Sequence, residues 1–180
     1  MEELLPDASF LYFCLAIGFR MNYSNRQTIA LIALRIALGW HFLYEGLTKI
    51  FQPGWTSSTY LMDSKGFLSG FYTWIASHPS VLSAADFLNE WGLTLIGLSL
   101  ILGLLTRIST IAGMLLLLFY YFSHPAWIGF EYIFPSEGAY FIVNKNIIEI
   151  FALLVICSFP TDKILGVERL IKRRKGITGG

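Results

Sequence analysis

The chain has 180 residues, of which 55% are hydrophobic and only 14% carry a charge, and its mean hydropathy is +0.60. Soluble domains usually contain about 25% charged residues, so this composition indicates an integral membrane protein, organised as one domain. The net charge of +1 provides no global field for nucleic acid, and two distant cysteines, Cys14 and Cys157, argue against a dithiol motif, an iron–sulfur site or a zinc cluster.

Residues 1–23 are expected to form an N-terminal extension or an interfacial segment. Their apolar run, residues 10–19, is too short to cross a bilayer, and no basic region precedes it as in a secretory signal. Met21 would be a natural start ahead of the first spanning helix.

The first membrane-spanning helix is predicted over residues 28–50, because about 20 apolar residues cross the roughly 30 Å hydrocarbon core. The Pro53-Gly54 pair is expected to end it. Residues 51–90, which follow, are mixed in polarity. Within them, apolar residues over 67–75 have helical spacing, in a stretch too short and polar to cross. We expect an amphipathic segment at the membrane interface between the first two spans, or a cap over the bundle.

Three further spans are predicted over residues 89–105, 108–123 and 144–159. Two spans are predicted on either side of Arg107, rather than one long helix, because a charge at the centre of a spanning helix would be costly. The predicted fold class is therefore all-α: an integral membrane four-helix bundle over residues 24–162, followed by a basic cytoplasmic tail over residues 163–180.

Lysine and arginine residues gather at one set of helix ends. Arg20 and Arg26 precede the first span, Arg107 lies between the second and third, and the run KRRK at 172–175 follows the fourth. Four spans place all of these on one side, and the positive-inside rule makes that side cytoplasmic. We therefore expect a multi-pass protein with both termini in the cytoplasm. Its first partner is the lipid bilayer, nucleic acid is not expected, and a homo-oligomer is compatible with the sequence.

Ionisable residues inside the predicted spans form a second pattern. His41, Glu45 and Lys49 share one ridge of the first helix at i, i+4 spacing, and Glu149 lies at the same predicted depth in the fourth. Arg35 points about 80 to 120° away from that ridge. Ionisable side chains buried in a membrane usually belong to a functional site. We therefore expect such a site in the outer half of the bundle. The alternative is that these residues form structural ion pairs, and that the lysine side chains extend their ammonium groups to water at the membrane surface.

The sequence resembles the DoxX/DoxD membrane family. RIALGWHFLYEGLTKI carries the first-helix signature of that family, at Arg35, Gly39, Phe42, Gly46 and Lys49. The segments GWTSSTYL, NEWGLTLIGLSLILGLLTR, YYFSHP and IVNKNIIE are similar to the small-subunit type of thiosulfate:quinone oxidoreductase. The resemblance covers about residues 24–170. It implies a four-helix membrane bundle with quinone-linked redox work, and thiosulfate oxidation in some archaeal members.

The resemblance leads us to expect a quinone-dependent oxidoreductase subunit of the inner membrane, with a quinone as cofactor. It would act on a small sulfur compound or serve a partner oxidoreductase. The candidate catalytic residues are His41, Glu45 and Glu149, because quinol chemistry moves protons that His41 or Glu149 would relay. The candidate substrate-binding residues are Arg35, Lys49, His124 and Asn144. No metal site is expected, since the ExxH spacing of metal-binding bundles is absent.

Two rival functions stay open at this point. One is a non-catalytic membrane scaffold that holds a redox partner through residues 51–90. The other is a small proton-coupled transporter, which four short helices without an internal repeat make less favoured.

Overall fold

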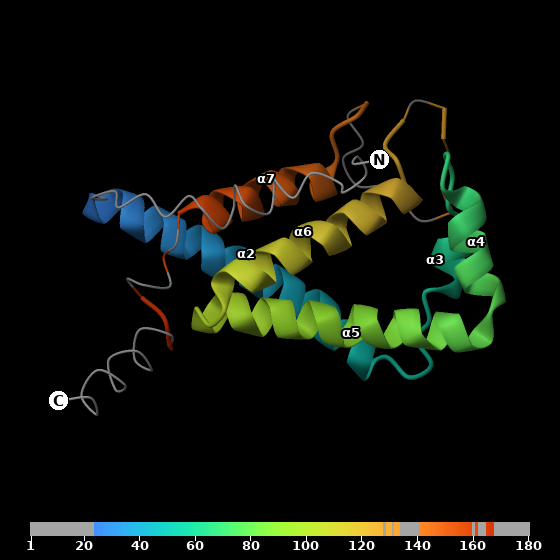
Figure 1. Ribbon diagram of the computed structural model, residues 1–180, viewed down its shortest axis with the longest axis horizontal. Helices are drawn as coiled ribbons and strands as arrows, with labels where there is room; N and C mark the ends of the chain where they lie inside the picture. Colours follow the sequence, from blue (N-terminus) through green and yellow to red (C-terminus); the bar gives the residue numbers. More distant parts are fainter. Residues whose placement is uncertain are drawn as a thin grey trace, which may run out of the picture.

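The computed structural model describes residues 24–127, 129–130, 132–133, 141–159, 161 and 165–167. Every regular element within them is a helix and none is a strand, so the predicted all-α class is confirmed for this part of the chain. Figure 1 shows the helices α2 (Asn25–Phe51), α3 (Ser58–Met62), α4 (Ser69–Ser77), α5 (Pro79–Leu102), α6 (Thr106–Ser123) and α7 (Lys145–Ser158). The predicted N-terminal segment, residues 1–23, and most of the predicted tail, residues 163–180, lie outside the described residues.

Among the described residues, three helices, α2, α5 and α6, are long and apolar enough to cross a membrane. The chain is therefore a multi-pass membrane protein whose outer surface contacts lipid. The helix predicted over 144–159 is present as α7, with 14 residues. At 1.5 Å per residue it extends about 21 Å, less than the roughly 30 Å of a hydrocarbon core. That α7 crosses the membrane as a fourth span stays a prediction.

The first helix begins at a capping box. The Ser24 side chain accepts a hydrogen bond from the backbone N–H of Gln27 at 3.3 Å, and the Gln27 side chain accepts one from Ser24 N–H at 2.9 Å. These two bonds satisfy backbone donors that the first helical turn leaves unpaired. The helix ends at Phe51, just before Pro53, as predicted.

The second span begins earlier than predicted. The predicted span began at residue 89, whereas α5 is one continuous helix from Pro79 to Leu102. Proline is favoured in the first turn of a helix because its φ is already helical and it lacks an N–H, so Pro79 suits the start of α5. Gly103, with φ of 63°, ends the helix in the left-handed conformation.

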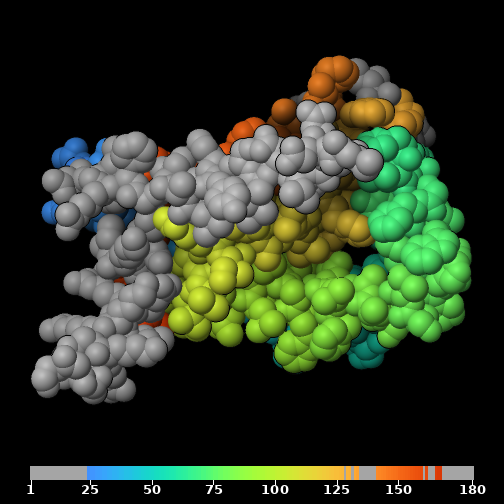
Figure 2. All heavy atoms as spheres, viewed as in Figure 1, coloured from blue at the N-terminus to red at the C-terminus, as the bar shows by residue number. Residues whose placement is uncertain are grey.

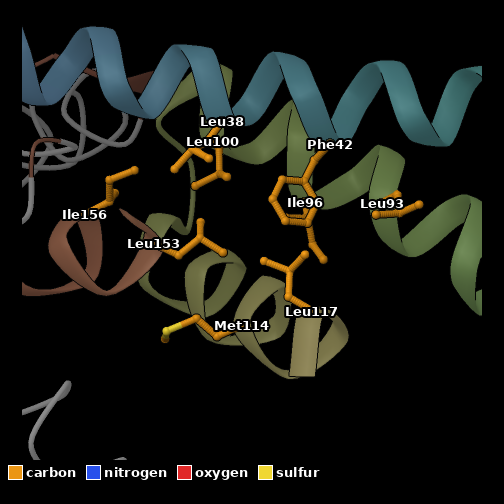
Figure 3. Close-up of a cluster of buried hydrophobic side chains, with 9 residues drawn as sticks. All are labelled: Leu38, Phe42, Leu93, Ile96, Leu100, Met114, Leu117, Leu153 and Ile156. Atoms are coloured by element: carbon orange, nitrogen blue, oxygen red, sulfur yellow. The ribbon is translucent and has the colours of Figure 1, made fainter. Parts of the chain in front are cut away.

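A buried apolar core joins four helices. Side chains from α2, α5, α6 and α7 meet in it (Figure 3): Leu38, Phe42, Leu93, Ile96, Leu100, Met114, Leu117, Leu153 and Ile156. Within this arrangement α2 packs along α5 and α6 packs along α7. Two helix pairs are thus held together by one core.

The predicted amphipathic segment is present as α4, preceded by the short helix α3. Buried Tyr72 of α4 donates a hydrogen bond to the backbone oxygen of Phe119 in α6 at 2.8 Å. In the space-filling view, α4 and the start of α5 cover one end of the molecule (Figure 2). The segment between α2 and α5 therefore packs against the helices at that end, and its place at a membrane interface stays a prediction.

Candidate functional site

A cavity of about 560 Å³ lies at the end of the molecule where α3 joins the long helices. Pockets for small molecules usually measure about 300 to 1,000 Å³. Its walls come from α2, residues 55–60, α5, α6, the segment after α6 and the start of α7. Six of the seven residues predicted from the sequence line it: His41, Glu45, Lys49, His124, Asn144 and Glu149.

His41 and Glu149 are brought together from helices far apart in the sequence. His41 Nε2 lies 3.2 Å from Glu149 Oε1, and the Glu149 side chain is only 12% exposed. The second carboxylate oxygen of Glu149 is buried and has no hydrogen-bond partner among the described residues. Asn144 sets the start of α7, because its side-chain oxygen accepts the N–H of Ile147 at 3.2 Å. This cap places Glu149 about one and a half turns into the helix, facing α2.

Lys49 is held by a second polar group on the cavity wall. Its Nζ donates to Asn89 Oδ1 at 3.1 Å and lies 3.8 Å from a carboxylate oxygen of Glu45. The Tyr120 hydroxyl donates to the same Asn89 oxygen at 2.8 Å. The ammonium also lies 5.3 Å from the centre of the Trp55 ring, within the range of a cation–π contact. Glu45 is therefore engaged by Lys49, and its side chain is 42% exposed.

Arg35 does not belong to this site. Its side chain is 1% exposed, and it donates to Thr161 Oγ1 at 3.0 Å and to the backbone oxygen of Leu165 at 2.8 Å. His41 follows six residues later, which is about 9 Å along the helix axis. Arg35 was predicted to bind substrate together with residues that line the cavity, and the structure places it outside that cavity. Helical periodicity placed Arg35 on another face of α2. The residues that Arg35 contacts on that face, Thr161 and Leu165, follow α7 in the chain.

His124 follows the last residue of α6 and lies beside Asp63, the residue that follows α3. Burial lowers the pKa of the His124 imidazole from its ordinary value, and nearby Lys65 adds to this effect while Asp63 opposes it. Burial also raises the pKa of Tyr132, a neighbour of His124, to about 12. His124 is therefore neutral at pH 7 and able to accept a proton.

Two wall residues, Asn89 and Tyr120, were not assigned a role in the site from the sequence, nor was Asp63, which lies beside the wall residue His124. Asn89 and Tyr120 carry only a weak signal, since both are polar groups at the outer ends of spans. Asp63 lies in a stretch expected to be turn and loop, and its partner is distant in the chain. Among the described residues no group of three or more His, Cys, Asp or Glu side chains is placed to hold a metal ion.

A family model described as DoxX matches residues 30–126, which is more than half of the chain. The match runs from α2 through α6 and includes the cavity walls that these helices supply. No curated protein and no solved structure matches the chain.

Proposed function

The chain belongs to the DoxX family, and from that premise we propose that it is a quinone-linked redox component of the inner membrane. The ring of a quinone would occupy the cavity, and His41 with Glu149 would hold and pass the protons. The observation that carries the proposal is the 3.2 Å contact of these two side chains on the wall of a cavity between membrane helices.

The residues present fit a flat ring that carries oxygen atoms. Aromatic side chains line the cavity, among them Phe42, Trp55 and Tyr120, and aromatic faces pack against flat rings. The buried Glu149 oxygen that lacks a hydrogen bond among the described residues needs a donor. A ring hydroxyl would supply that donor. When bound, a quinone would supply redox chemistry in which protons accompany electrons.

His41 and Glu149 are suited to holding a proton between them. Imidazole and carboxyl groups at 3.2 Å can share one proton, and either can return it to a ligand in the cavity. The core residues Phe42 and Leu117 also line the cavity, so its inner end is apolar. Water exclusion strengthens the interaction of the pair with a bound ligand.

Lys49 and Asn144 would orient the ligand. The Lys49 ammonium lies on the cavity wall, fixed by Asn89, and offers a positive charge to a ligand oxygen. Asn144 lies at the rim, beside Lys145. Electrons would come from a small sulfur compound or from a partner oxidoreductase at this rim.

We also propose that α7 completes a four-helix transmembrane bundle with both termini in the cytoplasm. Its buried residues Leu153, Ile156 and Cys157 join the core or pack beside it, as a bundle helix would. A helix shorter than the bilayer core can be accommodated by local thinning. In this topology α4 lies at the outer interface and the cavity opens in the outer half.

The proposal is tested by purifying the protein from its native membrane and identifying retained small molecules by mass spectrometry. A quinone is expected in the wild type and in Glu149→Gln, which keeps the size and hydrogen bonding of the side chain. Quinone-dependent turnover should fall on the order of 10² to 10⁴-fold in Glu149→Gln and His41→Ala, as for the loss of a general acid or base. Glu90→Gln is the matched control, because Glu90 does not line this cavity.

Two results would contradict the proposal. One is the absence of both retained quinone and quinone-dependent turnover in a well-folded preparation. The other is wild-type turnover in Glu149→Gln and His41→Ala. If a protein partner is instead lost on editing residues 51–78, the scaffold function replaces the redox one.

A further inference from the structure

His124, which lines the cavity, forms a second acid–base pair with Asp63. His124 Nε2 lies 3.8 Å from Asp63 Oδ2, and the two side chains are 12% and 7% exposed. The Asp63 carboxylate also accepts the backbone N–H of Ile133 at 2.7 Å, which fixes it in place. A buried carboxylate with one strong donor and an imidazole beside it favours a positive charge on that imidazole.

Two aromatic rings contact the imidazole of His124. The Tyr60 ring stacks on His124 with centroids 3.9 Å apart, and the Tyr132 ring lies at 4.6 Å. Tyr132 is fixed in turn, since its hydroxyl donates to the backbone oxygen of Pro125 at 2.8 Å. His124, Tyr60 and Tyr132 all line the cavity. The imidazole therefore has a fixed orientation on the cavity wall.

One nitrogen of this imidazole is available for chemistry. Nε2 of His124 is buried and makes no hydrogen bond with any described residue, because 3.8 Å to Asp63 is too long for one. Nδ1 is engaged by Ser123 Oγ at 3.1 Å. A pair that served structure alone would close to hydrogen-bonding distance, since a buried polar atom left unpaired is costly. Here the unpaired atom belongs to a residue that lines the cavity.

The location of the pair complements that of His41 and Glu149. His41 and Glu149 lie within helices α2 and α7, whereas His124 and Asp63 lie just beyond the ends of α6 and α3. A proton held between helices in lipid needs a route to water, and the loop end of the molecule provides the nearest one. The charged and titratable groups that face His124 are Asp63 and Lys65, with the two tyrosines named above.

We propose that His124 is the outer proton carrier of the cavity and that Asp63 positions it. His124 takes up a proton from water at Nε2 at the loop end, and Asp63 stabilises the resulting imidazolium. The N–H bond then breaks and an O–H bond forms on a ligand oxygen, as the donor at the rim supplies the electrons. This inference rests on the proposed function for the ligand that receives the proton, and it adds Asp63 to the residues that serve the site.

The test uses the histidine content of the chain, which has only three histidines: His41, His78 and His124. Protein labelled with ¹³C in the histidine rings is titrated by NMR in lipid nanodiscs, and each signal is assigned with a single His→Gln variant. Asp63→Asn removes the charge but keeps an oxygen that can accept the N–H of Ile133. It is expected to lower the pKa of His124 by about one unit, while exposed His78 does not change.

Asp86→Asn is the matched control. Asp86 accepts the backbone N–H of Ser57 at 2.9 Å near the same end of the molecule, and it does not line the cavity. The second measurement is the pH profile of electron transfer from a soluble donor to a short-chain benzoquinone. In Asp63→Asn the alkaline limb should move to lower pH by the same amount as the NMR titration of His124, because protonated His124 supplies the proton. In His124→Gln the rate should fall on the order of 10² to 10⁴-fold.

The outcomes separate this inference from the proposed function. An unchanged His124 titration in Asp63→Asn, with His41 and His78 signals native, would overturn the pairing. A shifted titration with an unmoved alkaline limb would overturn the proton route. A shifted titration in a protein that binds no quinone at any pH would support the pair and overturn the proposed quinone function.

Discussion

His41 Nε2 lies 3.2 Å from Glu149 Oε1, and this contact joins α2 to α7 across the cavity. Because α2 packs along α5 and α6 packs along α7, the contact links the two helix pairs at a point where side chains face a ligand-sized space. Burying two polar side chains where the helix pairs meet costs free energy. That cost is reasonable where the pair serves a ligand.

The packing of α2 against α5 depends on glycine, and Gly97→Ala should disrupt it. A Cβ at Gly97 would meet the backbone nitrogen of Leu43 and, at 2.6 Å, the backbone oxygen of Gly39. Backbone atoms cannot move aside cheaply, so the helices must separate. The expected loss of stability is about 1 to 3 kcal/mol, measured by thermal unfolding in detergent micelles.

Gly92→Ala is the control on the same helix. A Cβ there has no heavy atom within 4 Å among the described residues, and alanine is the better helix former. This variant should be neutral or slightly stabilising. Equal melting temperatures for Gly97→Ala and Gly92→Ala would contradict the close helix approach.

Arg35→Ala should destabilise the protein without affecting the cavity. The guanidinium is buried and donates to Thr161 and to the backbone of Leu165, and hydrogen bonds from a charged donor contribute about 1.5 to 3 kcal/mol each. We expect a loss of about 2 to 3 kcal/mol. Arg26→Ala, at an exposed position in the same helix, should change stability by less than about 0.5 kcal/mol.

Ligand retention separates structure from function for Arg35. At a temperature where Arg35→Ala stays folded, it should retain quinone as well as the wild type does. Loss of quinone at full structural integrity would return Arg35 to the site.

Much of the helical framework could be predicted from the sequence. Apolar length and the Pro53 signal located α2, and the break before Arg107 located α6, each to within a few residues. These signals are local, which is why they suffice. The start of α5 was missed because Pro79 has two local meanings, a break or a first helical turn, and the choice depends on how α4 packs beside it.

The site was predictable only in part, because its contacts are long-range. Equal predicted depth placed Glu149 level with the polar ridge of the first helix, but it did not identify His41 as the residue that Glu149 contacts. Nothing local indicates that Asp63 would reach His124, since that contact depends on how α3 folds over the end of α6. Arg35 shows the same limit: periodicity gives the direction of a side chain but not the segment that packs there.

Acid should destabilise the wild type more than His124→Gln. Burial lowers the pKa of His124 in the folded protein, and Lys65 acts in the same direction against Asp63. As pH falls below about 6.5, the unfolded chain therefore takes up the proton first, and the folded state loses relative stability. The neighbouring Tyr60 and Tyr132 do not titrate in this range.

The measurement is the melting temperature between about pH 7.5 and pH 5.5, where histidine changes charge. The wild type should lose more stability over this range than His124→Gln. His78→Gln is the control, since its ring is exposed, and it should follow the wild type. Identical slopes for wild type and His124→Gln would show that His124 is not a buried neutral group.

The proposed topology predicts which turns reach the outside of the membrane. Leu105 lies at the turn between α5 and α6 and is 54% exposed, and Ile133 lies in the segment between α6 and α7 and is 74% exposed. Both positions suit a single cysteine in a background where Cys14 and Cys157 are replaced by alanine. In intact cells, a membrane-impermeant maleimide should label Ile133→Cys, and it should label Leu105→Cys only after permeabilisation. This follows because Arg107 marks its turn as cytoplasmic, while one helix crossing brings the chain to the other side. The reverse labelling pattern would invert the molecule and place the cavity, with His124 and Asp63, on the cytoplasmic side.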